Sequence, residues 1–120
     1  IAVCLKGNDE LLGDLFAMPE EDAISVEWDF TPRFAGQGYA FEAAHALFAH
    51  LFDARHARRL YAYVEDTNQP SQRLCRKLGM RLEGTFMEFV SFMNDQKGQP
   101  VYENTMQYAI LRREWSTLKA

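Results

Sequence analysis

Apolar and polar residues alternate strictly from residue 24 to residue 30, which is the pattern of a half-buried β-strand. Downstream, apolar residues recur every three or four positions between Ala40 and Phe52, the pattern of a helix with a wide apolar face. The turn between these two segments contains Gly36 and Gly38. The pattern therefore predicts a strand, a glycine-rich turn and a helix around which the rest of the chain is organised.

Two shorter apolar segments, Ile1–Lys6 and Leu11–Met18, precede this unit, and the residues between them have the composition of a hairpin turn. Residues 19–22 are a proline and three acidic side chains, which predicts a solvated loop. After the first helix and a polar break, alternation from Leu60 to Val64 predicts another strand. A strand, a helix and a strand of this length imply a right-handed parallel crossover.

A second helix is predicted by the residues that bound it. Asn68 is a good N-cap, a proline falls in the first turn, and Gly79 ends the segment. A long strand to Asn94 and a turn at Gly98 follow. No internal repeat or linker divides the chain, so we expect one domain over residues 1–120.

The length of 120 residues is sufficient for one domain with a real core, and 48% apolar and 25% charged residues are ordinary globular values. The net charge of −4 argues against nucleic acid as a general partner. No apolar run reaches the roughly 18–20 residues of a membrane helix, and no signal peptide opens the chain. Cys4 and Cys75 lack metal-site spacing, so we expect no metal and a cytoplasmic location.

The turn at Gly36 and Gly38 is suited to an anion, because glycines let a ligand approach the main chain and the first amides of a helix have no partner within it. The dinucleotide fingerprint needs a third glycine where Phe41 stands, and the P-loop needs Gly-Lys, so neither motif matches. The pattern Arg33-x-x-Gly36-x-Gly38 resembles the Gln/Arg-x-x-Gly-x-Gly/Ala loop of the GNAT family of N-acetyltransferases. In that family the loop amides hold the pyrophosphate of acetyl-coenzyme A.

Later segments strengthen this resemblance. The sequence from Asn68 to Met80 is similar to the family signature Asn-x-x-Ser/Ala-x-x-x-Tyr-x-Lys-x-Gly-Phe. The segments Arg81–Gly84 and Tyr108–Trp115 resemble the RimJ/RimL-like branch, which acetylates the N-termini of ribosomal proteins. The resemblance covers essentially the whole chain. It implies an α+β fold: a mixed, mostly antiparallel sheet with a central splayed pair of parallel strands and flanking helices.

The resemblance also implies which residues hold the cosubstrate acetyl-coenzyme A. Main-chain groups at the end of the first central strand would pair with the pantetheine amides, and the glycine turn would hold the pyrophosphate. Asn68 and Ser71 would face the pantetheine and the thioester, while Arg76 or Lys77 would reach the outer phosphates. The expected cofactor-binding residues are Phe30, Thr31, Arg33, Phe34, Ala35, Gly36, Gln37, Gly38, Tyr39, Ala40, Asn68, Ser71, Arg76 and Lys77.

The implied reaction is attack of a neutral amine on a thioester carbonyl, which needs a deprotonated amine and a proton for the leaving thiolate. Candidate bases are Glu27, Asp29 and Glu88, each of which can also be read as a surface residue. Glu27 alternates with apolar neighbours, so it faces away from the apolar side of its strand unless a bulge intervenes. The usual tyrosine of the signature is Cys75 here, and a thiol could also donate a proton, although it is shorter than a phenol. The resemblance to the N-terminal-acetylating branch implies that the Ser71 hydroxyl is the donor, and we expect Cys75 to pack in the core.

The family normally has a first strand and a pair of helices before this hairpin, and these wall the acceptor site. The chain begins at Ile1 without them, so we expect either a truncated chain or a site completed by a second copy. An uncovered edge at Ile1–Lys6 favours a two-fold dimer. The resemblance favours a protein N-terminal amine as acceptor. The alternatives are a small-molecule amine such as a polyamine or an aminoglycoside, and a catalytically weak acyl-coenzyme A-binding module.

Overall fold

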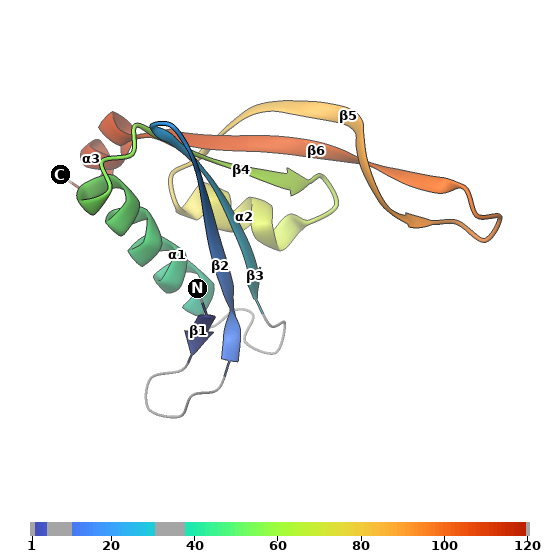
Figure 1. Ribbon diagram of the computed structural model, residues 1–120, viewed down its shortest axis with the longest axis horizontal. Coiled ribbons are helices and arrows are strands. Elements are labelled where there is room, and N and C mark those ends of the chain that lie inside the picture. Colours follow the sequence, from blue (N-terminus) through green and yellow to red (C-terminus); the bar gives the residue numbers. More distant parts are fainter. Residues whose placement is uncertain (1, 5–10, 31–37, 120) are drawn as a thin grey trace.

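The computed structural model describes residues 2–4, 11–30 and 38–119, and the strands in these residues form one sheet in the order β1-β2-β3-β4-β6-β5 (Figure 1). The strands are β1 (Ala2–Cys4), β2 (Leu11–Glu20), β3 (Ala23–Phe30), β4 (Arg59–Glu65), β5 (Arg81–Asn94) and β6 (Pro100–Leu111). The helical elements are α1 (Tyr39–Ala49), the π-helical turn η2 (His50–Ala54), α2 (Gln69–Lys77) and α3 (Arg112–Lys119). All neighbouring strands are antiparallel except β3 and β4, which confirms the predicted mixed sheet.

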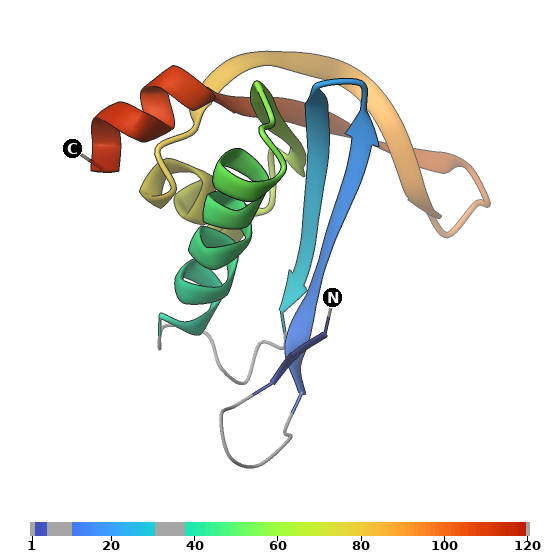
Figure 2. The ribbon, with the colours of Figure 1, turned by 60° about the vertical axis from the view of Figure 1, so that its left-hand side comes forward.

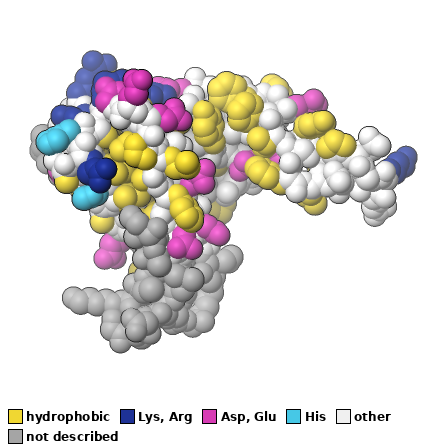
Figure 3. Space-filling view, in the orientation of Figure 1, with side chains coloured by type: hydrophobic (Ala, Val, Ile, Leu, Met, Phe, Trp, Pro, Cys, Tyr) yellow, Lys and Arg dark blue, Asp and Glu magenta, His cyan; other side chains and the backbone are white. Residues whose placement is uncertain are grey.

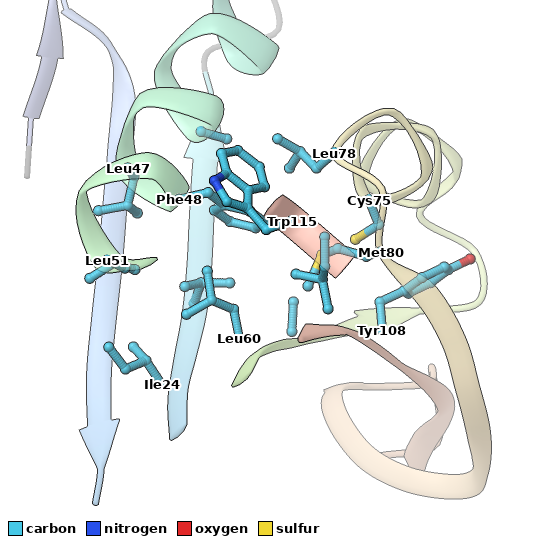
Figure 4. Packing of buried hydrophobic residues seen from close by; sticks show 14 of the residues in the cluster. Ile24, Leu47, Phe48, Leu51, Leu60, Cys75, Leu78, Met80, Tyr108 and Trp115 are labelled. Carbon is cyan, nitrogen blue, oxygen red and sulfur yellow. The ribbon is translucent and has the colours of Figure 1, made fainter. Parts of the chain in front are cut away.

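The hydrophobic core lies between one face of the sheet and the helices, with α1 and α2 packed on that face (Figure 2). In β3 the alternation is confirmed, because Ile24 and Val26 are buried while Glu27 and Asp29 are exposed. Trp115 of α3 joins the layers, since its ring centroid lies 5.6 Å from that of Phe52. Around it lie Leu47, Phe48 and Leu51 from α1 and η2, and Cys75 and Leu78 from the region of α2 (Figure 4).

The two central parallel strands separate after a short paired segment. Pairing is confined to Ala23–Ser25 of β3 and Arg59–Tyr61 of β4. Beyond these residues the strands diverge, so that the ends of β3 and β4 lie well apart (Figure 1). The predicted splayed pair is confirmed, and among the described residues no strand pairs with β3 on the β4 side from residue 26 to residue 30.

Two element boundaries differ from the sequence prediction. The expected acidic loop at residues 19–22 is shorter than predicted: Glu21 and Asp22 form an exposed turn, but β2 continues through Pro19 and Glu20, which pair with Ile24 and Ala23. Among the described residues β1 pairs with β2 only between Leu11 and Asp14, so no described strand pairs with Pro19 on that side, and a proline is tolerated at such an edge. The first helix ends at Ala49 rather than Phe52, and the wider turn η2 continues it.

The sequence pattern also missed the final helix, α3. The backbone N–H of Leu111 donates to Glu114 Oε1 at 2.9 Å, so a carboxylate three residues into the segment caps the helix start. The same carboxylate binds Arg81, which holds the pKa of Glu114 below its usual value and ties α3 to β5. Glu114, three residues after Leu111, is a sequence signal from which the start of this helix could have been predicted.

We predict that Gly13→Ala destabilises the fold by about 1–3 kcal/mol, as expected for overpacking against a rigid neighbour. A Cβ on Gly13 would lie 2.2 Å from the backbone oxygen of Asp29 and 2.8 Å from Cα of Phe30. Because those are main-chain atoms, β2 and the end of β3 must move apart. Thermal or urea unfolding measures the loss.

Gly84→Ala is the matched control, because a Cβ on Gly84 in β5 meets no atom within 4 Å among the described residues. We expect it to leave the free energy of unfolding within about 0.5 kcal/mol of the wild-type value. Equal losses at the two positions would contradict the close approach of β2 to β3.

Candidate active site

Gly38 begins the helix that starts at the splay. It is the N-cap of α1, with φ 81° and ψ 0°, a left-handed conformation that glycine adopts at little cost. Its carbonyl accepts the N–H of Glu42 at 3.0 Å, which closes the first helical turn. A helix N-terminus that carries no capping side chain presents its amides to an anion. The predicted cofactor-binding residues Thr31, Arg33, Phe34, Ala35, Gly36 and Gln37 lie outside the described residues.

A hydrogen bond crosses the layers at the splay. Nε1 of Trp28, on β3, donates to Oγ of Ser71, on α2, at 3.1 Å. The N–H of an indole is a donor only, so the Ser71 oxygen acts as the acceptor and its own hydroxyl proton remains to be donated. Ser71 is half-buried in the first turn of α2. The structure therefore brings the predicted proton donor to the end of the first central strand.

Asn68 fixes the start of α2. Its side-chain Oδ1 accepts the backbone N–H of Ser71 at 3.2 Å, the bond expected of an N-cap. Asn68 and Ser71 are thus parts of one local structure, and the cap orients the turn that carries the Ser71 hydroxyl. Asn68 as a whole is an exposed residue.

The two expected phosphate ligands of α2 lie in different surroundings. Nζ of Lys77 lies 5.2 Å from the ring centroid of Phe41, in the first turn of α1, so its ammonium is held near the helix start. Arg76 instead extends toward the sheet, with Nη1 3.5 Å from the hydroxyl of Tyr108. Lys77 is consequently the cation of this pair that the structure places beside the start of α1.

The three candidate bases all lie at exposed positions. Glu27 and Asp29 are exposed on β3, and Glu27 pairs in register with Phe16 of β2 on the sheet face opposite the helices. Glu88 is exposed in a bulge of β5, with φ 49°. Glu27 is therefore next to Trp28 in the sequence, but its side chain lies on the opposite face of the sheet. Glu88 lies on a different strand, β5.

Cys75 lies in the core rather than at the splay. Its side chain is fully buried between neighbours of the hydrophobic cluster, and burial raises the pKa of its thiol to about 12. Apolar side chains of the hydrophobic cluster enclose this thiol. Its position agrees with the packing role assigned from the sequence.

Sequence reasoning missed two residues that position the site. Trp28 was read only as an apolar position, although a half-buried tryptophan generally needs an acceptor for its N–H. Asn104 of β6 was not singled out; its Nδ2 donates to Asp66 Oδ2 at 3.0 Å and its Oδ1 accepts the N–H of Glu88 at 2.8 Å. It thereby ties the loop before Asn68 to the bulge of β5, a link between segments that no local sequence pattern announces.

A hollow lies at the end of the sheet away from the splay, where β3 and β4 begin and β6 ends. Arg58 and Arg113 line it, and Arg58 forms an ion pair with Asp22 at 2.8 Å. In the residues 2–4, 11–30 and 38–119 no three His, Cys, Asp or Glu side chains are placed to hold a metal ion. None of the described helices is long and apolar enough to cross a membrane.

Proteins similar to this chain include acetyltransferases from two Bacillus species. The chain is 32% identical over 116 residues to an uncharacterized N-acetyltransferase, YnaD, of Bacillus subtilis (strain 168), covering 95% of this chain and 65% of YnaD. The crystal structure of an acetyltransferase of the GNAT family from Bacillus anthracis superimposes with a TM-score of 0.82 at 30% identity, over 93% of this chain and 65% of that one. The chain thus spans just under two thirds of the length of these relatives.

Two more distant structures share the fold alone. One is the ribosomal-protein-S5-alanine acetyltransferase of Vibrio fischeri, with a TM-score of 0.82 at 17% identity, over 95% of this chain and 61% of that one. The other is an F149A mutant of the spermidine N-acetyltransferase SpeG of Vibrio cholerae, with a TM-score of 0.83 at 16% identity, over 99% of this chain and 68% of that one.

The family follows from the sequence itself. The family model described as an acetyltransferase (GNAT) domain matches residues 1–81, which include the glycine turn, the crossover helix and the segment that carries Ser71. The splay of β3 from β4 and the helix start at Gly38 lie inside that matched region. The chain therefore belongs to the GNAT family of acetyltransferases.

Proposed function

We propose that this chain transfers the acetyl group of acetyl-coenzyme A to a primary amine, and that the acceptor is a protein N-terminal amine. GNAT enzymes use acetyl-coenzyme A, and the family membership motivates the reaction class. The observation that carries the proposal is the Trp28–Ser71 hydrogen bond, because it holds at the splay the hydroxyl to which we assign proton donation.

The cosubstrate fits the splay in three respects. From residue 26 to residue 30, β3 pairs with β2 but with no described residue on the β4 side, so its backbone there offers donors and acceptors to the amides of pantetheine, in the manner of an added strand. The N-terminus of α1 at Gly38 offers amides to a pyrophosphate. Lys77 adds a cation beside that helix start. These features support a cofactor site that runs from β3 to α1.

The chain's own groups supply the proton transfers. The Trp28 indole fixes the Ser71 oxygen as an acceptor, so that the hydroxyl proton is directed elsewhere and is available to the leaving sulfur. Glu27 lies on the face of β3 opposite the helix layer, so an amine that approaches from the open face meets a carboxylate before it reaches the splay. We assign Glu27 the proton of the incoming ammonium; Glu88 and Asp29 are the competing bases.

The choice of acceptor rests on the resemblance of the later segments to the RimJ/RimL-like branch. The two fold neighbours at 16–17% identity act, by name, on a ribosomal protein and on spermidine, so the fold does not select between these acceptors. A panel of N-terminal peptides, polyamines and aminoglycosides, with release of free coenzyme A as the readout, tests the assignment. Turnover with the amines but not the peptides would overturn the protein acceptor, and coenzyme A binding without turnover would leave only the binding module.

We predict that Ser71→Ala lowers kcat by about 100-fold, the effect of removing a general acid, while the affinity for coenzyme A changes by less than about threefold. Cys75→Ala is the comparison, because it truncates the neighbouring buried side chain of α2 and leaves the hydroxyl in place. We expect it to lower the melting temperature with kcat nearly unchanged. The reverse order of the two kcat values, from steady-state kinetics at saturating cosubstrate, would make Cys75 the acid.

We predict that Trp28→Phe lowers kcat several-fold, because the ring is kept while the N–H that orients Ser71 is lost. In the double variant with Ser71→Ala the loss should be no greater than in Ser71→Ala alone, since both changes act on one hydroxyl. Trp115→Phe, in the core far along the chain, controls for the loss of a tryptophan and should affect stability only. Additive losses of kcat would show that Trp28 acts independently of Ser71.

We predict that Gly38→Val lowers the affinity for coenzyme A by tenfold or more, about 1.4 kcal/mol or above. A branched side chain resists φ 81° and fills the space in front of the helix start, where nothing within 4 Å among the described residues now lies. Calorimetric titration of coenzyme A into the folded variant measures the change.

Gly98→Val controls for backbone strain. Gly98, in the turn of the β5–β6 hairpin, has φ 78° and also has nothing within 4 Å in the described part of the chain. Both variants should therefore lose a similar amount of stability, but only Gly38→Val should lose coenzyme A affinity. An unchanged affinity in folded Gly38→Val would place the phosphates elsewhere.

A further inference from the structure

The hollow at the end of the sheet away from the splay is built from three segments that backbone hydrogen bonds join. The N–H of Arg58 donates to the carbonyl of Asp22 at 2.8 Å, and the N–H of Arg112 donates to the carbonyl of Arg58 at 2.9 Å. These bonds fix the turn between β2 and β3, the loop before β4 and the start of α3 relative to one another. The walls of the hollow are therefore in place before a ligand binds, which lowers the cost of binding.

Arg112 is an oriented cation in this hollow. Its Nε donates to the carbonyl of Ala57 at 3.0 Å, and its Nη2 donates to the carbonyl of His56. Both acceptors are neutral, and Arg112 forms no ion pair with a carboxylate of the described residues. A guanidinium has five N–H donors in one plane, so donors remain for a further acceptor. The positive charge of Arg112 is thus held in place without being neutralised.

The backbone at His56 is strained where it contributes to the hollow. His56 has φ 56°, in the left-handed region that few residues other than glycine adopt. It follows η2, at a position where glycine is the usual residue. The same turn brings the His56 carbonyl to Arg112. Strain of this kind is frequent at binding sites, where the surrounding contacts maintain it.

Positive charge exceeds negative charge around the hollow. Three arginines line it, Arg58, Arg112 and Arg113, against one carboxylate, Asp22. The chain as a whole has a net charge of −4, so this surplus is local. Figure 3 shows Lys and Arg side chains gathered at the end of the molecule that carries α3.

The arginines other than Arg112 are accessible to a ligand. Arg58 and Asp22 form an ion pair at 2.8 Å, but both side chains are 58% exposed. An exposed ion pair of this kind contributes little free energy, so a competing anion displaces Asp22 at small cost. Arg113 is exposed and forms no ion pair with a described carboxylate. Both guanidinium groups can therefore turn toward an anion bound beside Arg112.

The size and the charge of the hollow fit a small dianion. Its volume is about 620 Å³, within the range of about 300–1,000 Å³ that is usual for small-molecule sites. Three arginines against one aspartate leave a surplus of two positive charges. A phosphate monoester carries about −1.5 to −2 near pH 7, whereas a single carboxylate carries −1. Guanidinium groups also donate two parallel hydrogen bonds to phosphate oxygens.

We propose that this hollow binds a phosphate dianion, either the free ion or the phosphate group of a small molecule. Arg112 is the fixed donor, and Arg58 and Arg113 complete the neutralisation of the phosphate charge. The site is separate from the splay: β3 runs from Ala23 to Phe30, so its two ends lie roughly 23 Å apart at about 3.3 Å per residue. Phosphate binding is therefore tested without any measurement of acetyl transfer.

The experiment is an NMR titration that follows the side-chain Nε–H signals of the arginines at constant ionic strength. The probes are inorganic phosphate and ribose 5-phosphate, with ribose and acetate as controls. We expect the signals of Arg58, Arg112 and Arg113 to follow one saturating curve with each phosphate probe. Acetate should bind at least tenfold more weakly, and ribose should cause no change.

The two phosphate probes distinguish the sources of the ligand. Tighter binding of ribose 5-phosphate than of inorganic phosphate would assign the hollow to a phosphorylated small molecule, and equal binding would assign it to the free ion. Shifts that do not saturate, or that occur equally at the exposed Arg73 of α2, would overturn the proposal, because they would show only general attraction of anions to surface cations.

Charge variants test which residues bind the phosphate. Arg113→Gln and Arg58→Gln should each raise the dissociation constant about tenfold, through the loss of a charge-assisted hydrogen bond. Arg73→Gln is the matched control: it removes the same charge from a residue that does not line the hollow, and it should change the constant by less than twofold. Thermal melts check that each variant is folded. Equal losses in Arg73→Gln and Arg113→Gln would contradict a site at the hollow.

Asp22→Asn tests the proposal in the opposite direction. It removes the carboxylate that competes for Arg58, so phosphate should bind at least twofold more tightly. Weaker binding in the folded variant would contradict a site in which the ligand displaces Asp22.

Coenzyme A also carries phosphate groups, so the titration is repeated with one equivalent of coenzyme A present. An unchanged phosphate affinity would support two separate sites. A lost affinity would show that phosphate had occupied the place where coenzyme A binds, and would overturn the proposal. The arginine signals of the hollow report phosphate binding even if coenzyme A does not bind at the splay, so the two proposals can fail independently.

Discussion

The separation of β3 from β4 is the constraint on which the rest of this site depends. The two parallel strands pair over three residues each and then part. Where the strands separate, backbone groups of β3 face the side that β4 has left and can bind a ligand. At the same place Trp28 of β3 reaches Ser71 of α2. The helix start at Gly38 adds a place for negative charge. A sheet with full pairing between β3 and β4 would supply none of the three.

The structure separates the two sides of the proposed reaction by faces of the sheet. Trp28, Ser71 and Lys77 belong to the helix side. Glu27 and the exposed ring of Tyr63 belong to the open side. A cosubstrate held on the helix side and an amine held on the open side would meet at the splay. Rate enhancement by positioning two substrates in this way needs no strong general base, which fits the exposed surroundings of all three candidate carboxylates.

The sequence predicted those parts of the fold that depend on local pattern. The alternation in β3, the glycine at the start of α1 and the cap at Asn68 are short-range signals, and the structure confirms each of these elements. Three features were not predicted because they depend on distant residues: the continuation of β2 through Pro19, the Trp28–Ser71 hydrogen bond, and the bulge that Asn104 holds. Asn104 contacts Asp66 and Glu88, and no periodicity links these positions.

The central claim is that coenzyme A binds at the splay and the start of α1. An amide-resolved NMR titration with coenzyme A tests it most directly, because the indole N–H of Trp28 and the amides of Gly38 and Ser71 are separate reporters. We expect the largest chemical-shift changes at these three groups, with little change at Arg58 and Arg113. Shifts that instead gather at the hollow lined by Arg58 and Arg113, with the splay unchanged, would contradict it.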